Sequence, residues 1–186
     1  MPNNVKRWRV LRTPLQNLMR FDDEDTMADH RFDALRGSRL AAELDDAQCR
    51  TLAELTELME LNDGDVLVRE GTSDDHLFIV ISGALGVVRH PAGEPAITLH
   101  TLVAGDFAGE MSFIDGTERY ASLQAVGPTR VMSLRRPQLE SLLKSDPEIV
   151  YRAMRAIIRT AHAIQRRLSI QSVELANYIY KQHGRY

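Results

Sequence analysis

The chain has 186 residues, of which 44% are hydrophobic, and a formal net charge of −3. This length gives room for one globular domain with a sizeable core and some peripheral helix, but not for two full domains. The single cysteine, Cys49, excludes an intramolecular disulfide, and the sequence has neither a secretory signal nor an apolar run of about 20 residues that would span a membrane.

Residues 1–37 show no sustained hydrophobic periodicity. They join a basic and aromatic opening at residues 6–9 to an acidic patch at residues 22–25. We expect an arm or a pair of short helices here. Two roles stay open: a docking segment for a partner, or an extension packed on the same chain or on a second copy.

The next segment, SRLAAELDDAQCRTLAEL, has the features of one or two short helices. Ser38, Asp45 and Asp46 are suitable N-cap residues, and apolar residues follow at helical spacing to about Leu55. This segment therefore leads into the main body of the domain as helix.

From Thr56 to about Leu134 the chain changes to short runs rich in β-forming residues, separated by turns. The runs include ELMEL, VLVREG, HLFIVISG, ALGVVRH and AITLHTL. No stretch between them is long enough for the helix of a parallel crossover, so the pattern predicts an antiparallel sandwich or roll. Five glycines stand at the turns, where a left-handed backbone or a close approach favours this residue: Gly64, Gly71, Gly83, Gly93 and Gly105.

A short helix is expected around residues 137–143, and a long helix after it. Asp146 is a suitable N-cap, Pro147 favours the first helical position, and Glu148 complements the helix dipole in the first turn. From Val150 onward the chain has seven basic residues and one acid, a net charge of +6 that leaves −9 for residues 1–149.

The long helix carries apolar residues at alternating steps of three and four, which is a heptad seam interrupted by Gln171. At about 1.5 Å per residue the helix would be roughly 50 Å long, longer than the rest of the domain is expected to be wide. The seam therefore needs a partner. The simplest is a second copy of the chain in a two-fold dimer, and the alternative is the helix's own domain. The seam residues are Val150, Met154, Ile157, Ala161, Ile164, Leu168, Leu175 and Ile179.

The stretch GEMSFIDGTERYA, residues 109–121, places Glu110 and Arg119 between two apolar runs. Either the two charges form an ordinary ion pair, or they hold a ligand. A cyclic phosphodiester suits the second explanation, because a compact single negative charge is well bound by an Arg fork together with backbone N–H groups. Arg119 would supply the fork, the amides of residues 110–112 would point at the same phosphate, and Gly109 would permit its close approach.

Together with the segments around it, this stretch resembles the cyclic nucleotide-binding domain family, to which the catabolite activator protein and the regulatory subunit of protein kinase A belong. The supporting pieces DGDVLVREG, LFIVISGALGVV, VAGDFAGE and FAGEMSFIDGTERYASLQA, and a long helix that begins at DPE, occur in the family's order from about Ser38 to Leu168. The resemblance implies an α+β, mainly β fold: an antiparallel double-stranded β-helix (a jelly-roll-like β-roll) flanked by N-terminal helices and a long C-terminal helix. The implied divisions are residues 1–37 (arm or short helices), 38–145 (β-roll domain) and 146–182 (dimerisation helix).

The resemblance also implies a ligand and its contacts. Glu110 would accept a hydrogen bond from the ribose 2′-hydroxyl, as the family's glutamate does, and so favour ribonucleotides. We expect cyclic AMP (cAMP) first, with cyclic GMP (cGMP) or another cyclic nucleotide as alternatives, and no metal. The candidate contacts are Gly109, Glu110, Met111, Ser112, Arg119, Tyr120, Ala121, Leu99, Ile164 and Gln165.

Two places depart from the family's pattern. Tyr120 stands where the family usually has Ser, Thr or Ala, and a ring of that size would block the pocket, stack or turn outward. Ile164 and Gln165 fall where the catabolite activator presents a Thr-Ser pair to adenine. Ile164 cannot hydrogen-bond and Gln165 can, which leaves the base preference open.

The sequence does not favour other functions. In the family's transcription regulators a helix-turn-helix follows the long helix, whereas this sequence stops at Tyr186, so we expect no sequence-specific DNA binding. The six histidines contain no His-x-His pair, and no nucleophile-elbow sequence accompanies Ser112, Asp106 and His100. We therefore expect neither a metal site nor catalysis.

The sequence thus predicts a cytoplasmic cyclic nucleotide sensor that does not contact a membrane. It would be a homodimer through residues 147–182, in which the ligand changes the pose of the long helix and so the affinity for an unknown protein partner. The alternative is a ligand-free relative that serves as a dimeric protein-interaction scaffold.

Overall fold

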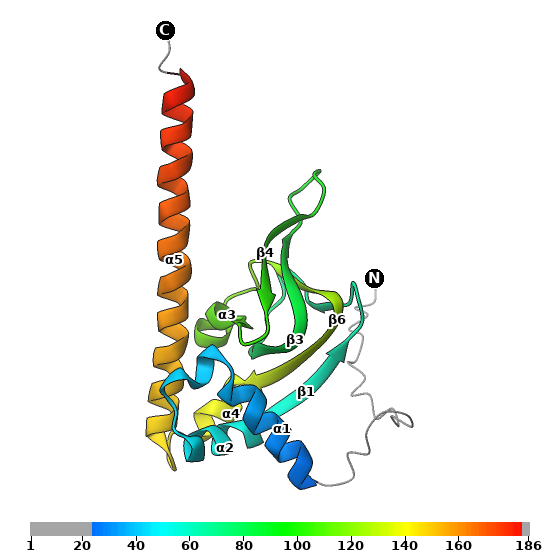
Figure 1. Cartoon of the computed structure of the whole chain (residues 1–186), viewed down its shortest axis with the longest axis vertical. Helices are drawn as coiled ribbons and strands as arrows, with labels where there is room; N and C mark the ends of the chain where they lie inside the picture. The colour runs from blue at the N-terminus through cyan, green and yellow to red at the C-terminus, as the bar shows by residue number, and fades with distance from the viewer. Residues whose placement is uncertain (1–23, 184–186) are drawn as a thin grey trace.

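The computed structural model describes residues 24–183, which form a β-roll with short helices beneath it and a long helix that rises beside it (Figure 1). The helices are α1 (Glu24–Arg36), η1 (Arg39–Glu43), α2 (Asp46–Glu54), α3 (Glu110–Asp115), α4 (Arg136–Ser141) and α5 (Pro147–His183). The strands are β1 (Thr56–Leu61), β2 (Val66–Val68), β3 (His76–Arg89), β4 (Ile97–Val103), β5 (Phe107–Ala108) and β6 (Ser122–Arg135).

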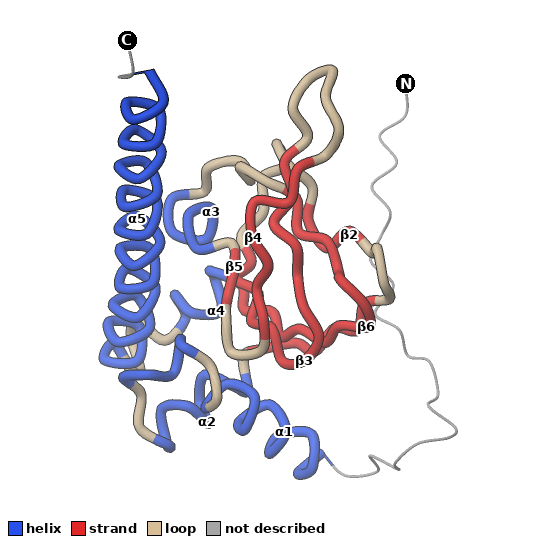
Figure 2. The backbone as a smooth tube through the Cα atoms, turned by 45° about the horizontal axis from the view of Figure 1, so that its top comes forward, coloured by secondary structure: helices blue, strands red, loops and turns tan. Residues whose placement is uncertain are grey.

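All the strand pairs are antiparallel, and the sheet order is β1-β6-β3-β4, with β2 on β6 and β5 on β3. The two 14-residue strands, β3 and β6, pair with each other and curve through the roll (Figure 2). The predicted fold class, a mainly β antiparallel roll with flanking helices, is confirmed.

Alternate side chains of β3 enter two different cores, because successive residues of a strand point to opposite faces. Leu77 and Ile79 face the helical core, which lies between the sheet and the helices α1, η1, α2, α4 and the start of α5. Phe78 and Val80 face the roll core, which fills the inside of the β-roll. The sheet therefore separates the helices from the interior of the roll.

The sequence predicts a turn at Gly83, but the structure has one continuous strand there. β3 passes through Gly83 with a φ of 77°, and its register with β6 shifts between Ser82 and Ala84. A Cβ on this glycine would collide with the carbonyl of Pro128 and lie 2.6 Å from the hydroxyl oxygen of Thr129. The glycine therefore bends the strand instead of ending it, because β6 passes too close for a larger residue.

The N-terminal helices pack on the roll. Leu35 of α1 is buried in the helical core together with Leu40 of η1. Asp45 caps α2 as predicted: its side chain accepts from the N–H of Gln48 at 2.9 Å, and the Gln48 side chain accepts from the N–H of Asp45. Of the two roles expected for residues 1–37, packing on the same chain therefore holds for α1. Residues 1–23 lie outside the described part of the chain. The three predicted divisions of the chain stay predictions.

The long helix α5 begins at Pro147 as predicted, and its first part faces its own domain. Ile157 is fully buried in the helical core, and Val150 and Met154 pack against that core. The seam prediction is therefore wrong for Ile157, which has no exposed surface for a partner, whereas for the partly buried Val150 and Met154 it stays a prediction. Heptad spacing does not distinguish a chain's own core from a partner, because both require an apolar stripe on one face.

Farther along, α5 rises past α3 and projects beyond the body of the roll (Figure 1). Ile170, Val173 and Tyr180 are exposed on this part of the helix. The side chains of the predicted seam residues 168, 175 and 179 lie outside the described residues. Among the helices that the structure describes, α5 included, none has both the length and the apolar character needed to cross a membrane.

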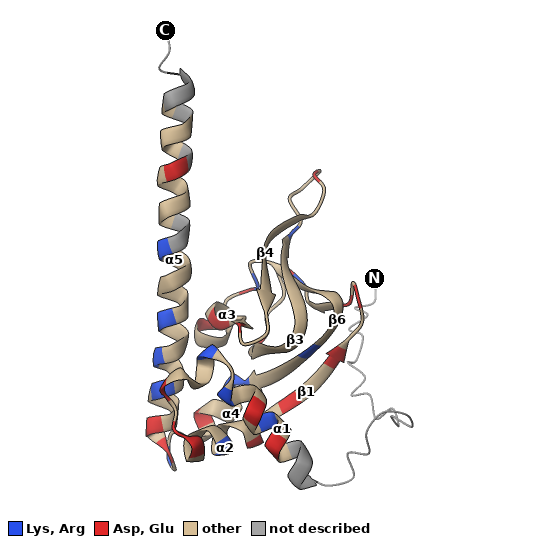
Figure 3. Cartoon of the chain, viewed as in Figure 1, with Lys and Arg blue, Asp and Glu red and all other residues tan. Residues whose placement is uncertain are grey.

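Basic residues are grouped on the lower part of α5, near the N-terminal helices (Figure 3). Several of them bind those helices. Arg155 and Arg159 both form ion pairs with Glu43 of η1, whose side chain is 14% exposed; the distance from Arg155 Nε to Glu43 Oε2 is 3.1 Å. Arg152 donates to the carbonyl of Glu43 at 3.0 Å and to the side chain of Gln48 at 3.1 Å. Part of the basic tail therefore binds within the chain itself.

Candidate functional site

Arg119 is held in place by the loop that joins β2 to β3. Its N–H donates to the carbonyl of Thr72 at 2.9 Å, and its carbonyl accepts from the N–H of Gly71 at 2.8 Å. The side chain turns inward and is only 4% exposed. The chain thus places a guanidinium inside the roll, where an uncompensated charge would cost free energy.

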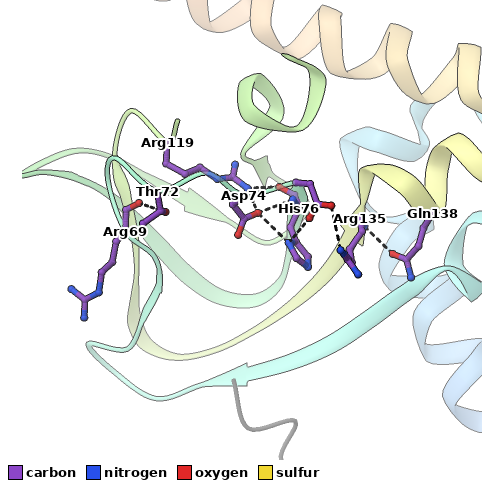
Figure 4. Close-up of polar contacts among 8 residues, drawn as sticks. Arg69, Thr72, Asp74, His76, Arg119, Arg135 and Gln138 are labelled. Carbon is purple, nitrogen blue, oxygen red and sulfur yellow. Dashed lines mark hydrogen bonds and ion pairs between the residues drawn. The ribbon is translucent and has the colours of Figure 1, made fainter. Parts of the chain in front are cut away.

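The guanidinium is compensated on one side (Figure 4). Its Nη2 donates to Asp74 Oδ1 and to the carbonyl of His76, both at 2.6 Å. The ring of Phe78 lies 5.7 Å from its Cζ. Its Nε and Nη1 are buried and have no hydrogen-bond partner among the described residues. Arg119 therefore has one satisfied nitrogen and a second edge that can donate to an acceptor.

Asp74 is the counter-ion of this arginine. Burial alone would raise the pKa of its carboxyl, but hydrogen bonds from His76 and from the Arg119 guanidinium lower that pKa to about 2. The neighbouring carboxylate of Asp75 pairs with Arg135, just before α4, at 3.4 Å. The two acids and His76 bring three potential metal-ligand atoms within 4.8 Å of one another. The two arginines balance these carboxylates and would repel a metal cation.

Gly109 allows the guanidinium to approach the start of α3. Its φ is 90°, and a Cβ on it would collide with the side chain of Arg119 and lie 2.9 Å from the carbonyl oxygen of His76. The sequence predicts close approach of a phosphate to this glycine, whereas in the structure the group that comes close is Arg119. A larger residue could not occupy this position without moving the arginine.

The first turn of α3 lies beside the guanidinium. Its hydrogen-bond ladder begins with the N–H of Phe113, which donates to the carbonyl of Gly109 at 2.9 Å. The N–H groups of residues 110–112 therefore lie outside the ladder. The side chain of Ser112 is buried and that of Glu110 is partly buried. Backbone donors, a carboxylate and a guanidinium thus meet at one place.

These groups form one wall of a pocket that opens from the inside of the roll. Eight of the ten predicted contacts lie in the lining: Gly109, Glu110, Met111, Ser112, Arg119, Tyr120, Ala121 and Ile164. The remaining lining residues are Val87, His100, Leu102, Phe107, Ala108 and Leu123. The pocket therefore combines a polar end, at Arg119 and α3, with a largely apolar wall.

Comparison with known proteins agrees with this geometry. Residues 58–146 match the sequence profile of a family described as cyclic nucleotide-binding domain. A solved cyclic nucleotide-binding domain from Methylobacillus flagellatus KT superposes with a TM-score of 0.68 at 24% identity, over 77% of this chain and 80% of that one. The catabolite activator protein of Thermus thermophilus superposes with a TM-score of 0.61 at 26% identity, over 77% of this chain and 64% of that one. Over residues 58–146 the chain therefore resembles the cyclic nucleotide-binding domain family in sequence, and its fold is that of the solved domains.

A curated relative is also similar to part of this chain. The Pycsar effector protein BcPycTIR of Burkholderia cepacia is 28% identical over 120 residues, which is 64% of this chain. The match spans only 38% of that protein's length. The likeness therefore concerns one part of the relative and does not extend to its remainder.

Two predicted contacts, Leu99 and Gln165, lie outside the pocket. Leu99 is 50% exposed, because alternation along β4 turns His100 and Leu102 toward the pocket and Leu99 to the other face. Gln165 follows Ile164 and is therefore rotated by about 100° around the helix axis. It lies on an exposed face of α5 together with Arg166, Ser169 and Ile170.

Tyr120 lies in the wall of the pocket and is partly accessible. It is 48% exposed, although its neighbours Arg119 and Ala121 are buried. Burial, and then the carboxylate of Glu110, raise the pKa of the Tyr120 hydroxyl above its usual value, while Arg89 opposes the shift. The Tyr120 side chain therefore lines the pocket without filling it, and part of it is exposed to solvent.

Sequence reasoning missed Asp74 as a site residue. Asp74 stands in the polar stretch TSDDH, which is typical of a loop before a strand, and it lies 45 residues from Arg119. Nothing local in that stretch indicates a long-range ion pair. His100 was considered only as part of a catalytic triad; its spacing of two from Leu102 is the signal that would have placed it in the pocket wall.

Asp106, which the sequence analysis considered together with Ser112 and His100, has partners of its own in the structure. The Asp106 carboxylate pairs with Arg39 at 3.1 Å and accepts from the N–H of Val103 at 3.0 Å. These contacts fix the turn between β4 and β5. Asp106 therefore positions the chain that leads into the pocket wall.

Proposed function

We propose that the domain binds a 3′,5′-cyclic nucleotide, with cAMP as the first candidate, and acts as a regulatory sensor. The observation that carries this proposal is the buried guanidinium of Arg119, whose Nε and Nη1 have no hydrogen-bond partner among the described residues. A buried cation with two unused donors is stabilised by an anionic acceptor. A cyclic phosphodiester supplies one negative charge on a compact group, which suits these two donors of the guanidinium.

The other groups in the pocket suit the other parts of such a ligand. The N–H groups of residues 110–112 add donors for the phosphate oxygens. The carboxylate of Glu110 is an acceptor for the ribose 2′-hydroxyl. Val87, Leu102 and Leu123 form the apolar wall against which a base packs.

Ile164 offers a route from the ligand to the long helix, because it brings α5 into the pocket wall. A ligand in contact with Ile164 shifts the pose of α5 only to the extent that it binds one pose more tightly. We propose that a second copy of the chain covers the projecting part of α5, where Ile170 and Val173 are exposed. A further protein partner, which the fold does not identify, would bind with an affinity that depends on the position of α5.

A ligand-free scaffold is the second candidate function, and Asp74 favours it. The Asp74 carboxylate already neutralises Arg119, so the fold does not require a bound anion to balance the buried charge. In that case the pocket would have no regulatory ligand, and the projecting part of α5 would be the working surface.

Titration calorimetry with cAMP, cGMP, cyclic CMP, cyclic UMP and cyclic di-GMP separates the two functions. Arg119→Lys keeps a positive charge beside Asp74 but loses the fork, so we expect it to weaken binding roughly 10- to 100-fold. Arg130→Lys is the matched control, because Arg130 is exposed on β6 and pairs with Glu60 at 3.5 Å. Binding of no cyclic nucleotide, or equal binding by Arg119→Lys, would reject the sensor.

Two further measurements test the ribose contact and the dimer. Glu110→Gln should reduce the preference for cAMP over 2′-deoxy-cAMP, because an amide is a weaker acceptor for the 2′-hydroxyl than a carboxylate. Light scattering should give a dimer mass for the chain, and a monomer mass after Ile170→Asp combined with Val173→Asp. A monomer mass for the unaltered chain would reject the dimer.

A further inference from the structure

The pocket concentrates its charged groups at one end. Beyond Arg119, Glu110 and Ser112, the polar side chains in its lining are those of His100 and Tyr120, and the other lining residues are apolar or glycine. Such a wall offers a base few hydrogen-bond partners along its edge. Contact with the faces of the base therefore has to supply much of the binding at this end.

Tyr120 is suitably placed for such a contact. It follows Arg119 directly, lines the same pocket and is 48% exposed, whereas Phe107, the other aromatic lining residue, is buried. A ring that filled the pocket would be buried, and a ring turned outward would not line the pocket. The ring is therefore covered on one part and accessible on another, next to Glu110.

We propose that Tyr120 is an aromatic platform on which the base of the bound nucleotide stacks. This inference rests on the proposed function, since it requires a ligand held by Arg119 and Glu110. Every base has a π face, so stacking tolerates changes of base, whereas the contacts to phosphate and ribose do not tolerate changes of those groups. Stacking on Tyr120 thereby lets the site accept several bases, while the contacts to phosphate and ribose restrict the ligand to a cyclic ribonucleotide.

The test compares Tyr120→Ala and Tyr120→Phe in the full chain, by titration calorimetry with cAMP, cGMP, cyclic CMP and cyclic UMP. Tyr120→Ala should weaken binding of all four by roughly 5- to 100-fold, with the larger losses for the purines because their rings stack over a larger area. Tyr120→Phe keeps the ring and should restore most of the lost affinity. Tyr151→Ala is the control, because Tyr151 is an exposed tyrosine on α5 outside the pocket.

Several results would overturn the platform while leaving the proposed function intact. Equal or tighter binding by Tyr120→Ala would mean that the ring is a bystander or an obstruction. A loss confined to one base would mean recognition of a base edge, and a loss in Tyr120→Phe equal to that in Tyr120→Ala would assign the effect to the hydroxyl. In each case Arg119→Lys would still abolish most of the binding. Absence of binding by the unaltered chain and by both Tyr120 variants would overturn the platform and the proposed function together.

Discussion

Arg119 and Asp74 form a 2.6 Å ion pair within the β2–β3 loop region that also fixes the backbone of Arg119. The same carboxylate that orients the guanidinium also neutralises part of the charge that a phosphate would use. Asp74 is therefore both a positioning residue and a competitor for the arginine. This pair connects the affinity for an anionic ligand to the stability of the fold.

The first prediction concerns Asp74→Asn and ligand affinity. The amide oxygen of Asn can still accept from Arg119 Nη2, but the variant removes a negative charge beside the phosphate position. We expect binding of cyclic nucleotides to tighten by about three- to tenfold, because a nearby like charge is removed at little cost in geometry. Asp75→Asn is the control, because Asp75 pairs with Arg135 instead. Weaker binding by Asp74→Asn would show that the Asp74 carboxylate helps binding more by orienting Arg119 than it hinders binding by competing with the phosphate.

The second prediction concerns pH and stability. The Asp74 carboxyl has an ordinary pKa of 3.8, and in the folded chain hydrogen bonds from His76 and Arg119, acting against burial, lower this pKa to about 2. Because the folded value lies below the unfolded one, the ionised carboxylate stabilises the fold above pH about 4 by about 2 kcal/mol. That contribution is lost as the pH falls from about 4 toward 2.

Urea unfolding of the unaltered chain and of Asp74→Asn at several pH values measures this contribution. The difference in unfolding free energy between the two proteins should be largest near neutral pH and should shrink as Asp74 becomes protonated. A difference that stays constant from neutral pH to about pH 2.5 would mean that the carboxylate does not stabilise the fold through its charge.

The β-roll and the main part of the pocket could be predicted from sequence because their signals are local. Short β-rich runs between glycines define the roll, and Arg119, Glu110 and Gly109 stand within 11 residues of one another in GEMSFIDGTERYA. The ion pair of Arg119 with Asp74 could not be predicted, because it depends on how the β2–β3 loop pairs with the segment that precedes β6. Local patterns indicate which residues are available but not which distant loop meets them.

The directions in which individual side chains point also could not be predicted from the sequence. The sequence predicts contacts at Leu99 and Gln165, but each lies one residue from a pocket residue and faces another way. In a strand one residue reverses the face, and in a helix it turns the side chain by about 100°. For the same reason the apolar stripe of α5 predicted a partner without showing that Ile157 meets its own domain.

The third prediction compares two glycines with the same backbone conformation. Gly109 and Gly93 have φ values of 90° and 78°, but a Cβ at Gly109 would collide with Arg119, whereas at Gly93 nothing lies within 4 Å. Gly93→Ala should cost about 1 kcal/mol from backbone strain alone. Gly109→Ala should cost about 2–4 kcal/mol and should also weaken ligand binding, because the guanidinium must move. Thermal unfolding and calorimetry of both variants give the comparison. Equal stability losses would place the guanidinium away from Gly109.

The fourth prediction concerns the attachment of α5. The Glu43 carboxylate is nearly buried and pairs with Arg155 and Arg159, so Glu43→Gln leaves two arginines without their counter-charge and should cost about 1–3 kcal/mol. Hydrogen exchange should become faster in residues 147–159, where α5 is held to η1, than in the β-roll.

Glu148→Gln is the matched control for that variant. Glu148 is exposed and pairs with Arg152 one turn along the same helix, an arrangement that contributes about 0.5 kcal/mol or less. Equal effects of the two variants would mean that apolar packing around Ile157, and not the Glu43 ion pairs, holds the helix. If the pose of α5 is the output of the sensor, Glu43→Gln should also change ligand affinity although Glu43 lies outside the pocket, because loosening one pose shifts the equilibrium to which the ligand is coupled.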